Sequence, residues 1–244
     1  MPHMKITPLL NLFGIAALLV HGGAAAQALM PGVYLTERAW GQMTIKAAGA
    51  GGAQDFAIEA ISPNSHVCMV EGSIRNLRAS VDVGDKQPCL IDFVPKGAGL
   101  AVQPKNPREC RSFCGEGAQF DGVYFRPAPG CLAAEVARTR AVFKAQFDKK
   151  DYPLARATLA PVLANCGKLL ADGDAGWVRN DLALTYYRLG NPAECQRVLE
   201  PLGPVAAMSD EQVRDNYRAA EVPARLQLAG ATRANLKLCG VASK

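Results

Sequence analysis

Eight cysteines, following a segment typical of a secretion signal, constrain this chain more than any other feature. The first half contains Cys68, Cys89, Cys110 and Cys114, and the second contains Cys131, Cys166, Cys195 and Cys239. An even number of cysteines in an exported chain predicts disulfide bonds rather than free thiols. We therefore expect a protein that folds outside the reducing cytosol as two separately crosslinked modules.

Residues 1–28 are predicted to be a signal peptide. Lys5 is the only charged residue before Glu37, residues 9–20 are largely apolar, and Ala26-Gln27-Ala28 fits cleavage after Ala28. This order of a positive start, an apolar core and a small-residue exit is typical of export signals. The apolar run is shorter than the roughly 20 residues of a membrane span. We expect a periplasmic protein, or alternatively a secreted one, with no membrane insertion after cleavage.

The charge pattern gives no support to a nucleic-acid partner. The formal net charge of the 244-residue chain is +5, which is mild for its length. Its arginines are scattered and do not alternate with aromatic residues, as they do along many nucleic-acid surfaces. We predict a partner of another class.

Several pairings of the eight cysteines are open. We predict Cys68 with Cys110 and Cys89 with Cys114 in the first half. In the second half Cys131 pairs with Cys239, or either of them pairs with one of the two cysteines between. The C-x3-C spacing of Cys110 and Cys114 also suits zinc, but His66 is the only histidine after the signal segment, and structural zinc sites use four Cys or His ligands. We predict neither a metal nor a cofactor.

Residues 29–129 have the pattern of a disulfide-linked β-domain. Apolar and polar residues alternate in short runs, such as 43–46, 55–60 and 90–94, and glycine-rich turns separate the runs. Period-two alternation indicates half-buried strands. Seven or eight such strands predict a small antiparallel barrel or sandwich.

Some strings of this half resemble a known group of proteins. GVYLTE, FAIEAISPNSHVCMVEGSI, CLIDFV and CRSFCGEGAQFDGVYFRP resemble small exported bacterial β-barrel domains similar to lysozyme inhibitors of the C-type class. The resemblance covers about residues 32–127 and implies a barrel that binds a lytic enzyme. The binding-loop motifs of those inhibitors are not found at matching positions, so no inhibitory residue is assigned.

His66 is the polar residue of this half that most invites a catalytic role. A lone histidine is not a catalytic constellation, and no nucleophile motif accompanies it. We therefore expect its side chain to fix a turn. Glu71 and Asp121 each precede a glycine and are expected to shape turns rather than form a carboxylate pair.

Residues 130–244 change to a helical period. Four stripes of apolar residues at spacings of three and four begin near Leu132, Ala155, Val178 and Cys195. Such stripes indicate amphipathic helices. Asp151, Asn191 and Ser209 are expected to begin helices as N-caps.

Residues 177–202 resemble a tetratricopeptide repeat. The residues at its packing positions are Leu182, Ala183, Tyr186, Gly190, Cys195, Leu199 and Leu202. A weaker copy covers residues 143–163, and a degenerate third covers 210–238. The predicted fold class is therefore α+β in two separate domains, a β-barrel or sandwich followed by tetratricopeptide-like hairpins, with a nonrepeating helical bundle as the alternative.

Stacked hairpins present a concave surface to extended peptides or partner proteins. The candidate binding residues on that surface are Arg140, Lys144, Arg179, Asn180 and Arg188. Each could instead simply solvate its helix. The Asn180 amide could hold a partner's backbone carbonyl. Asp172 and Asp174 lie in a glycine-rich stretch and are expected to be loop residues rather than calcium ligands.

The function predicted from these patterns is binding without catalysis. Nucleophile elbows, zinc helices and phosphate loops are missing from the sequence. We expect a periplasmic protein that engages another envelope protein, a peptide or a cell-wall component, in one version as a lysozyme-type inhibitor or immunity protein. The alternatives are a structural subunit of an envelope assembly and a hydrolase whose site does not show in sequence. The sequence does not predict an oligomeric state.

Overall fold

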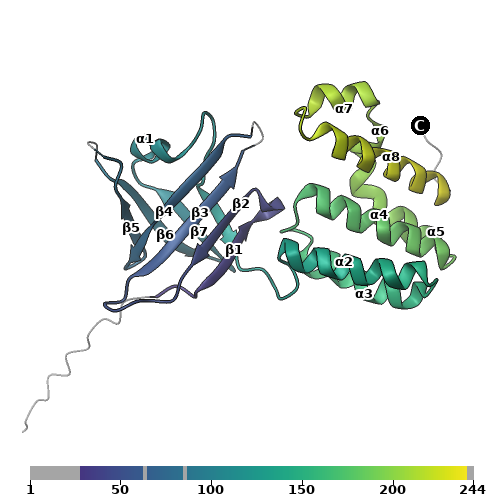
Figure 1. Cartoon of the computed structure of the whole chain (residues 1–244), viewed down its shortest axis with the longest axis horizontal. Coiled ribbons are helices and arrows are strands. Elements are labelled where there is room, and N and C mark those ends of the chain that lie inside the picture. The colour runs from purple at the N-terminus through teal and green to yellow at the C-terminus, as the bar shows by residue number, and fades with distance from the viewer. Residues whose placement is uncertain (1–27, 63–64, 85–86, 241–244) are drawn as a thin grey trace, which may run out of the picture.

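A computed structural model describes residues 28–62, 65–84 and 87–240. The predicted signal peptide lies outside these residues, apart from Ala28. Figure 1 shows a β-barrel and a group of helices side by side, with the β1–β2 end of the barrel directed toward the helices. Among the described helices none has the length and apolar character that a membrane crossing requires.

Eight antiparallel strands form a closed barrel in which each strand pairs with its neighbours in the chain and β8 pairs with β1. The strands are β1 (Gly32–Thr36), β2 (Gly41–Ile45), β3 (Gln54–Ile61), β4 (Val67–Arg75), β5 (Arg78–Val81), β6 (Cys89–Lys96), β7 (Gly99–Pro104) and β8 (Gly122–Phe125). Three short helical turns interrupt them: η1 (Glu37–Ala39), α1 (Pro107–Cys110) and η2 (Arg111–Phe113). The predicted barrel is confirmed, and the sandwich alternative is wrong.

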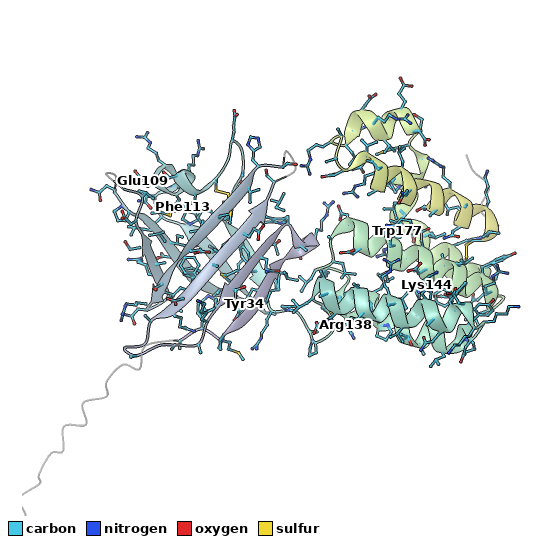
Figure 2. The ribbon with its side chains drawn as sticks, viewed as in Figure 1. Tyr34, Glu109, Phe113, Arg138, Lys144 and Trp177 are labelled. Carbon is cyan, nitrogen blue, oxygen red and sulfur yellow. A yellow bond between two sulfur atoms is a disulfide. The ribbon has the colours of Figure 1, made fainter. Side chains whose placement is uncertain are left out.

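The predicted alternation places apolar side chains inside the barrel. Phe56, Ile58 and Ala60 are buried along β3, and their neighbours point outward. Eight strands enclose a space that side chains can fill. Large buried side chains such as Phe93 and Tyr124 occupy it. Figure 2 draws the side chains of both modules and labels Tyr34 on β1. The barrel is therefore a packed body whose binding surface would be its outside.

The second module is helical, as predicted. Its elements are α2 (Ala133–Asp148), α3 (Tyr152–Cys166), α4 (Asp172–Arg188), α5 (Pro192–Leu199), η3 (Glu200–Leu202), α6 (Gly203–Ala207), α7 (Asp210–Asn216) and α8 (Val222–Leu238). Helices α2 and α3 form one hairpin and α4 and α5 another, and α8 packs against α4. The apolar stripes of these helices form one core, separate from the core of the barrel.

The prediction of tetratricopeptide-like hairpins is wrong. The alternation of paired helices ends at α5, which has only eight residues, and η3, α6 and α7 follow where a regular repeat needs another long hairpin. Proline restricts φ and lacks an amide hydrogen, so it weakens or interrupts the hydrogen bonding of a helix beyond its first turn. Pro201 and Pro204 therefore divide residues 200–207 between a 3-10 turn and a short helix.

The helix α4 begins at Asp172, six residues before Val178, where its apolar stripe begins. Asp172 and Asp174 were expected in a loop, but both lie in the first turn of α4. Carboxylates are favourable there because they face the positive end of the helix dipole. The glycine-rich composition of this stretch was misleading.

The four disulfides pair cysteines within each module, as predicted. The pairs in the barrel differ from the predicted ones, and the pairs in the helical module are one of the predicted alternatives. The barrel contains Cys68–Cys114 and Cys89–Cys110, so the predicted pairs, Cys68–Cys110 and Cys89–Cys114, are wrong. The helical module contains Cys131–Cys166 and Cys195–Cys239, not a bridge between its two ends. These bonds indicate an oxidising environment outside the cytosol.

The two modules touch where the β1–β2 turn meets the start of α4. The backbone N–H of Arg38 donates to the carbonyl of Lys168 at 2.7 Å. The Arg38 guanidinium donates from Nε to Asp172 Oδ1 at 2.8 Å and also pairs with Oδ2. Both Arg38 and Ala39 adopt positive φ, at 59° and 50°. Non-glycine residues adopt this conformation at a cost, so the turn has a definite shape where it meets the helices.

Candidate binding groove

A pocket of about 400 Å3 lies on the helical module between α2 and α4. The residues that line it are Arg140, Ala141, Phe143, Lys144, Phe147, Asp148, Asp181 and Leu184. On each helix they recur at spacings of three and four, which brings them to one face. We call this pocket the groove.

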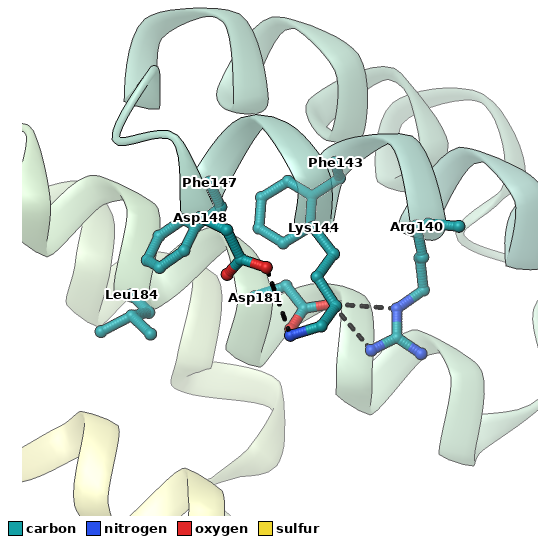
Figure 3. A pocket seen from close by; sticks show the side chains of 8 residues that line it. Arg140, Phe143, Lys144, Phe147, Asp148, Asp181 and Leu184 are labelled. Carbon is teal, nitrogen blue, oxygen red and sulfur yellow. Dashed lines mark hydrogen bonds and ion pairs between the residues drawn. The ribbon is translucent and has the colours of Figure 1, made fainter.

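The floor of the groove is apolar. Phe143 is buried and Phe147 half-buried, and their ring centroids lie 5.7 Å apart. Leu184 contributes from α4 on the opposite wall (Figure 3). Tyr152, at the start of α3, packs edge-on against Phe147 at 5.1 Å, which limits the motion of that ring. The floor is thus a preformed apolar surface.

Charges of alternating sign line the rim. Arg140 donates from Nε and Nη2 to Asp181 Oδ2 at 2.9 and 2.7 Å. Lys144 Nζ lies 3.7 Å from Asp148 Oδ2, and Figure 3 shows it between the two carboxylates. The two cations and two anions balance, so the groove has no net charge to select a charged ligand.

Asp181 is the electrostatically unusual group of the groove. Its side chain is only 25% exposed, and burial raises its pKa above the ordinary value, although Arg140 and Lys144 act to lower it. Both bonds from Arg140 go to Oδ2. Within the described part of the chain, Oδ1 accepts no hydrogen bond, so it can accept one from a ligand.

The structure brings only two of the five predicted binding residues into the groove. Arg140 and Lys144 line it. Arg188 is exposed and lies four residues beyond Leu184, the last α4 residue that lines the groove. Its guanidinium is 5.8 Å from the Tyr187 ring centroid. Arg179 is half-buried and donates from Nη1 to the Val198 carbonyl at 3.2 Å, and burial lowers its pKa.

Asn180 is not a surface residue. It is 3% exposed, and its amide contacts α8 rather than solvent. The prediction that its side chain holds a partner's backbone is therefore wrong. Asn180 lies two positions, or about 200° around the helix, from both Val178 and Leu182. It is therefore on the opposite side of α4 from that apolar stripe, and α8 covers this side.

Sequence reasoning missed Asp148, Asp181 and Leu184. The aromatic residues of the floor were interpreted only as core positions. Asp181 interacts with Arg140 from 41 positions away in the chain, and no local pattern indicates such a pair. The one sequence signal for Asp181 was its position directly before the apolar residues Leu182 and Ala183.

The other polar residues singled out from the sequence lie on the barrel, away from the groove. The carbonyl of His66 accepts bonds from the backbone and hydroxyl of Ser62, both at 3.0 Å, so His66 helps to form the turn before β4. Its ring lies against Gly115, where a Cβ would approach the His66 Cβ to 2.9 Å. Glu71 was predicted to shape a turn, which is wrong, because it lies on the outside of strand β4 opposite Ala57. Asp121 precedes β8. Residues 28–62, 65–84 and 87–240 form no cluster of three His, Cys, Asp or Glu side chains that could hold a metal ion.

Comparison of the chain with protein families, with curated proteins and with solved structures finds no match. The groove must therefore be interpreted from its own chemistry.

Proposed function

We propose that this protein is a non-catalytic binding protein of the bacterial periplasm that holds an extended segment of another envelope protein in the groove. The single observation that carries the proposal is the half-buried Arg140–Asp181 pair beside an apolar floor. Burying charged groups is costly unless they are paired. An ion pair on an open face, where apolar residues could stand instead, is better suited to recognising a ligand than to stabilising the fold.

A polypeptide segment matches the groove better than a charged small molecule does. Each peptide unit offers one N–H donor and one C=O acceptor. Asp181 Oδ1 can accept from the N–H, and the Lys144 ammonium, which is only loosely paired at 3.7 Å, can donate to the C=O. An apolar side chain of the same segment can then enter between Phe147 and Leu184. Small-molecule sites likewise combine an apolar lining with a few placed polar groups.

The proposal is tested by photocrosslinking at two alanines of the same helix. Ala141 lines the groove, while Ala134 is also exposed on α2 but does not line it. A crosslinking amino acid at each position would be used in periplasmic extract, and the adduct mapped by mass spectrometry. We expect one defined segment at Ala141, lost in the Phe147→Ala variant, and no adduct of that segment at Ala134.

Direct binding of the mapped segment completes the test. A synthetic copy should bind the purified protein, and Lys144→Glu should weaken it at least tenfold while leaving the helical circular dichroism unchanged. Equal crosslinking at Ala134 and Ala141 would contradict the proposal. So would an affinity for the segment that is unchanged in both Phe147→Ala and Lys144→Glu.

The lysozyme-inhibitor form of this function stays a prediction that rests on the resemblance of the barrel strings. It is checked by adding the purified protein at micromolar concentration to C-type muramidases. Loss of lytic activity would identify the barrel as a second binding body, and full activity would remove this version.

A further inference from the structure

Helix α4 is held from two sides, and the two contacts use adjacent residues. Asp181 faces α2 and pairs with Arg140. Asn180 faces α8, where it is almost fully buried. Consecutive residues on a helix point about 100° apart, so a contact at residue 180 determines where residue 181 points.

The contact between Asn180 and α8 is a complete hydrogen-bond network. Asn180 Nδ2 donates to the Gly176 carbonyl and to Thr232 Oγ1, both at 3.0 Å. Asn235 Nδ2 donates to Asn180 Oδ1 at 2.9 Å and to its carbonyl at 3.2 Å. Thr232 Oγ1 in turn donates to the Leu228 carbonyl at 2.8 Å. A buried amide is stable only when its polar atoms have partners, so α4 has one favoured rotation against α8.

The packing around this network leaves little space for another rotation. A Cβ on Gly176 would approach Leu228 Cδ2 to 2.8 Å, so the two helices come close there because residue 176 has no side chain. The far end of α8 is fixed as well. Cys239 is bonded to Cys195 of α5, and its carbonyl accepts from Gln196 Nε2 at 2.8 Å.

We infer that Asn180 is a positioning residue of the groove, and that α8 acts through it to direct the Asp181 carboxylate toward Arg140 and the ligand. This inference rests on the proposed function for its biological meaning, but not for its geometry. It makes the groove depend on a helix that contributes none of its lining residues.

The decisive variants change α8 and leave the groove untouched. Thr232→Val removes the hydroxyl acceptor of Asn180 at nearly constant volume, and Thr232→Ser retains it. Asn235→Ala is a milder second variant because Asn235 is only half-buried. Val162→Ala is the matched control, since it creates a cavity in α3 of the same core but removes no α4–α8 hydrogen bond.

The first measurement needs no ligand. The carboxyl carbon of Asp181 is followed by NMR through a pH titration. If α8 orients this carboxylate, Thr232→Val and Asn235→Ala expose it to water and lower its pKa toward the ordinary value, while Thr232→Ser and Val162→Ala leave it raised. An equal change in Val162→Ala, or no change in both α8 variants, would overturn the inference.

The second measurement uses N-acetyl-phenylalanine amide, which has one apolar side chain flanked by peptide groups. Its binding is followed by the amide shifts of α2 and α4. We expect the affinity to fall at least tenfold in Thr232→Val and to recover in Thr232→Ser. If the α8 variants move the pKa of Asp181 but the probe does not bind the wild-type protein, the positioning role stands and the proposed peptide ligand is wrong.

Discussion

The barrel and the helical module bury their polar side chains in different places. In the barrel, Thr36, Gln54 and Ser62 are buried at strand ends and turns, where they bond nearby backbone groups. In the helical module, the buried polar residues are inside helices α4 and α8, and they are Asn180, Thr185 and Thr232. The barrel has such groups at the ends of its strands, whereas the helical module has them between packed helices.

This difference follows from how each module satisfies its backbone. A closed barrel pairs every strand with two others, so its interior can be entirely apolar. Helices satisfy their own backbones and can leave one face open. The open face between α2 and α4 is where the helical module places a half-buried ion pair, at some cost in stability. We conclude that the barrel is a closed, packed body and that α4 carries the open, polar face of the helical module.

The largest effect is expected from removing a core side chain of the barrel. Phe93 is fully buried and packs edge-on against Phe56 at 5.1 Å. Phe93→Ala should destabilise the barrel by about 3–5 kcal/mol and leave the helical module folded. Calorimetry should show one of two transitions shifted, and the Asp181 carboxyl signal should not change. A joint loss of both modules would contradict their independence.

The next effect is expected from the disulfide that fixes α8. Replacing Cys195 and Cys239 with serine should lower the free energy of unfolding of the helical module by about 2–4 kcal/mol. Urea unfolding followed by far-UV circular dichroism at the helical band measures it. The matched control replaces Cys89 and Cys110, which should affect only the barrel; a helical loss in that control would argue against separate modules.

Two of the three acids of α4, Asp181 and Asp172, should respond to pH in opposite directions. Burial raises the pKa of Asp181, so its contribution to stability is present below the unfolded-state pKa and is lost as pH rises through the folded pKa. Arg38 lowers the pKa of Asp172, so its contribution is present above the unfolded-state pKa and is lost as pH falls through the folded pKa. Each effect should be below about 1 kcal/mol because both groups are partly exposed.

Urea unfolding between pH 3 and 7 checks these signs. The difference between the wild-type protein and Asp181→Asn should fall as pH rises, and the difference from Asp172→Asn should fall as pH decreases. Slopes of the same sign would show that the groove and the contact between the modules do not differ electrostatically.

The smallest effect on stability is expected at the rim. The Lys144 side chain is 77% exposed, and Lys144→Ala should change the free energy of unfolding by no more than about 0.5 kcal/mol. The same change should weaken binding of the mapped segment, which isothermal titration would detect. A change in stability without one in affinity would place Lys144 outside the binding surface.

The local features of the fold could be predicted from the sequence because neighbouring residues determine them. The side chains of Asp151, Asn191 and Ser209 accept from the amides three residues on, as their helix-start positions indicate. The alternation of β3 likewise predicts which of its side chains face inward. Barrel and sandwich could not be separated, since closure depends on pairing β1 with β8 across the whole domain.

The features that failed depend on contacts between distant elements. Cys68 pairs with Cys114 because residues 68 and 114 form an isolated bridge between β4 and the segment after η2, and spacing alone does not show that register. Asn180 was predicted to lie on the surface because its partner on α8, Thr232, is 52 residues away in the chain. No local pattern indicates that contact. Asp181 and Leu184 were missed for the same reason, since they line the groove only because α2 lies beside α4.

The confinement of each disulfide to one module has a consequence for how the chain matures. An exported polypeptide emerges with its amino end first, and the last barrel cysteine, Cys114, precedes the first helical one, Cys131. An oxidase can therefore seal the barrel while the rest of the chain is still being translocated, and no bond has to wait for a distant thiol. Errors of pairing are then limited to three arrangements within each group of four, instead of the 105 open to eight thiols released together.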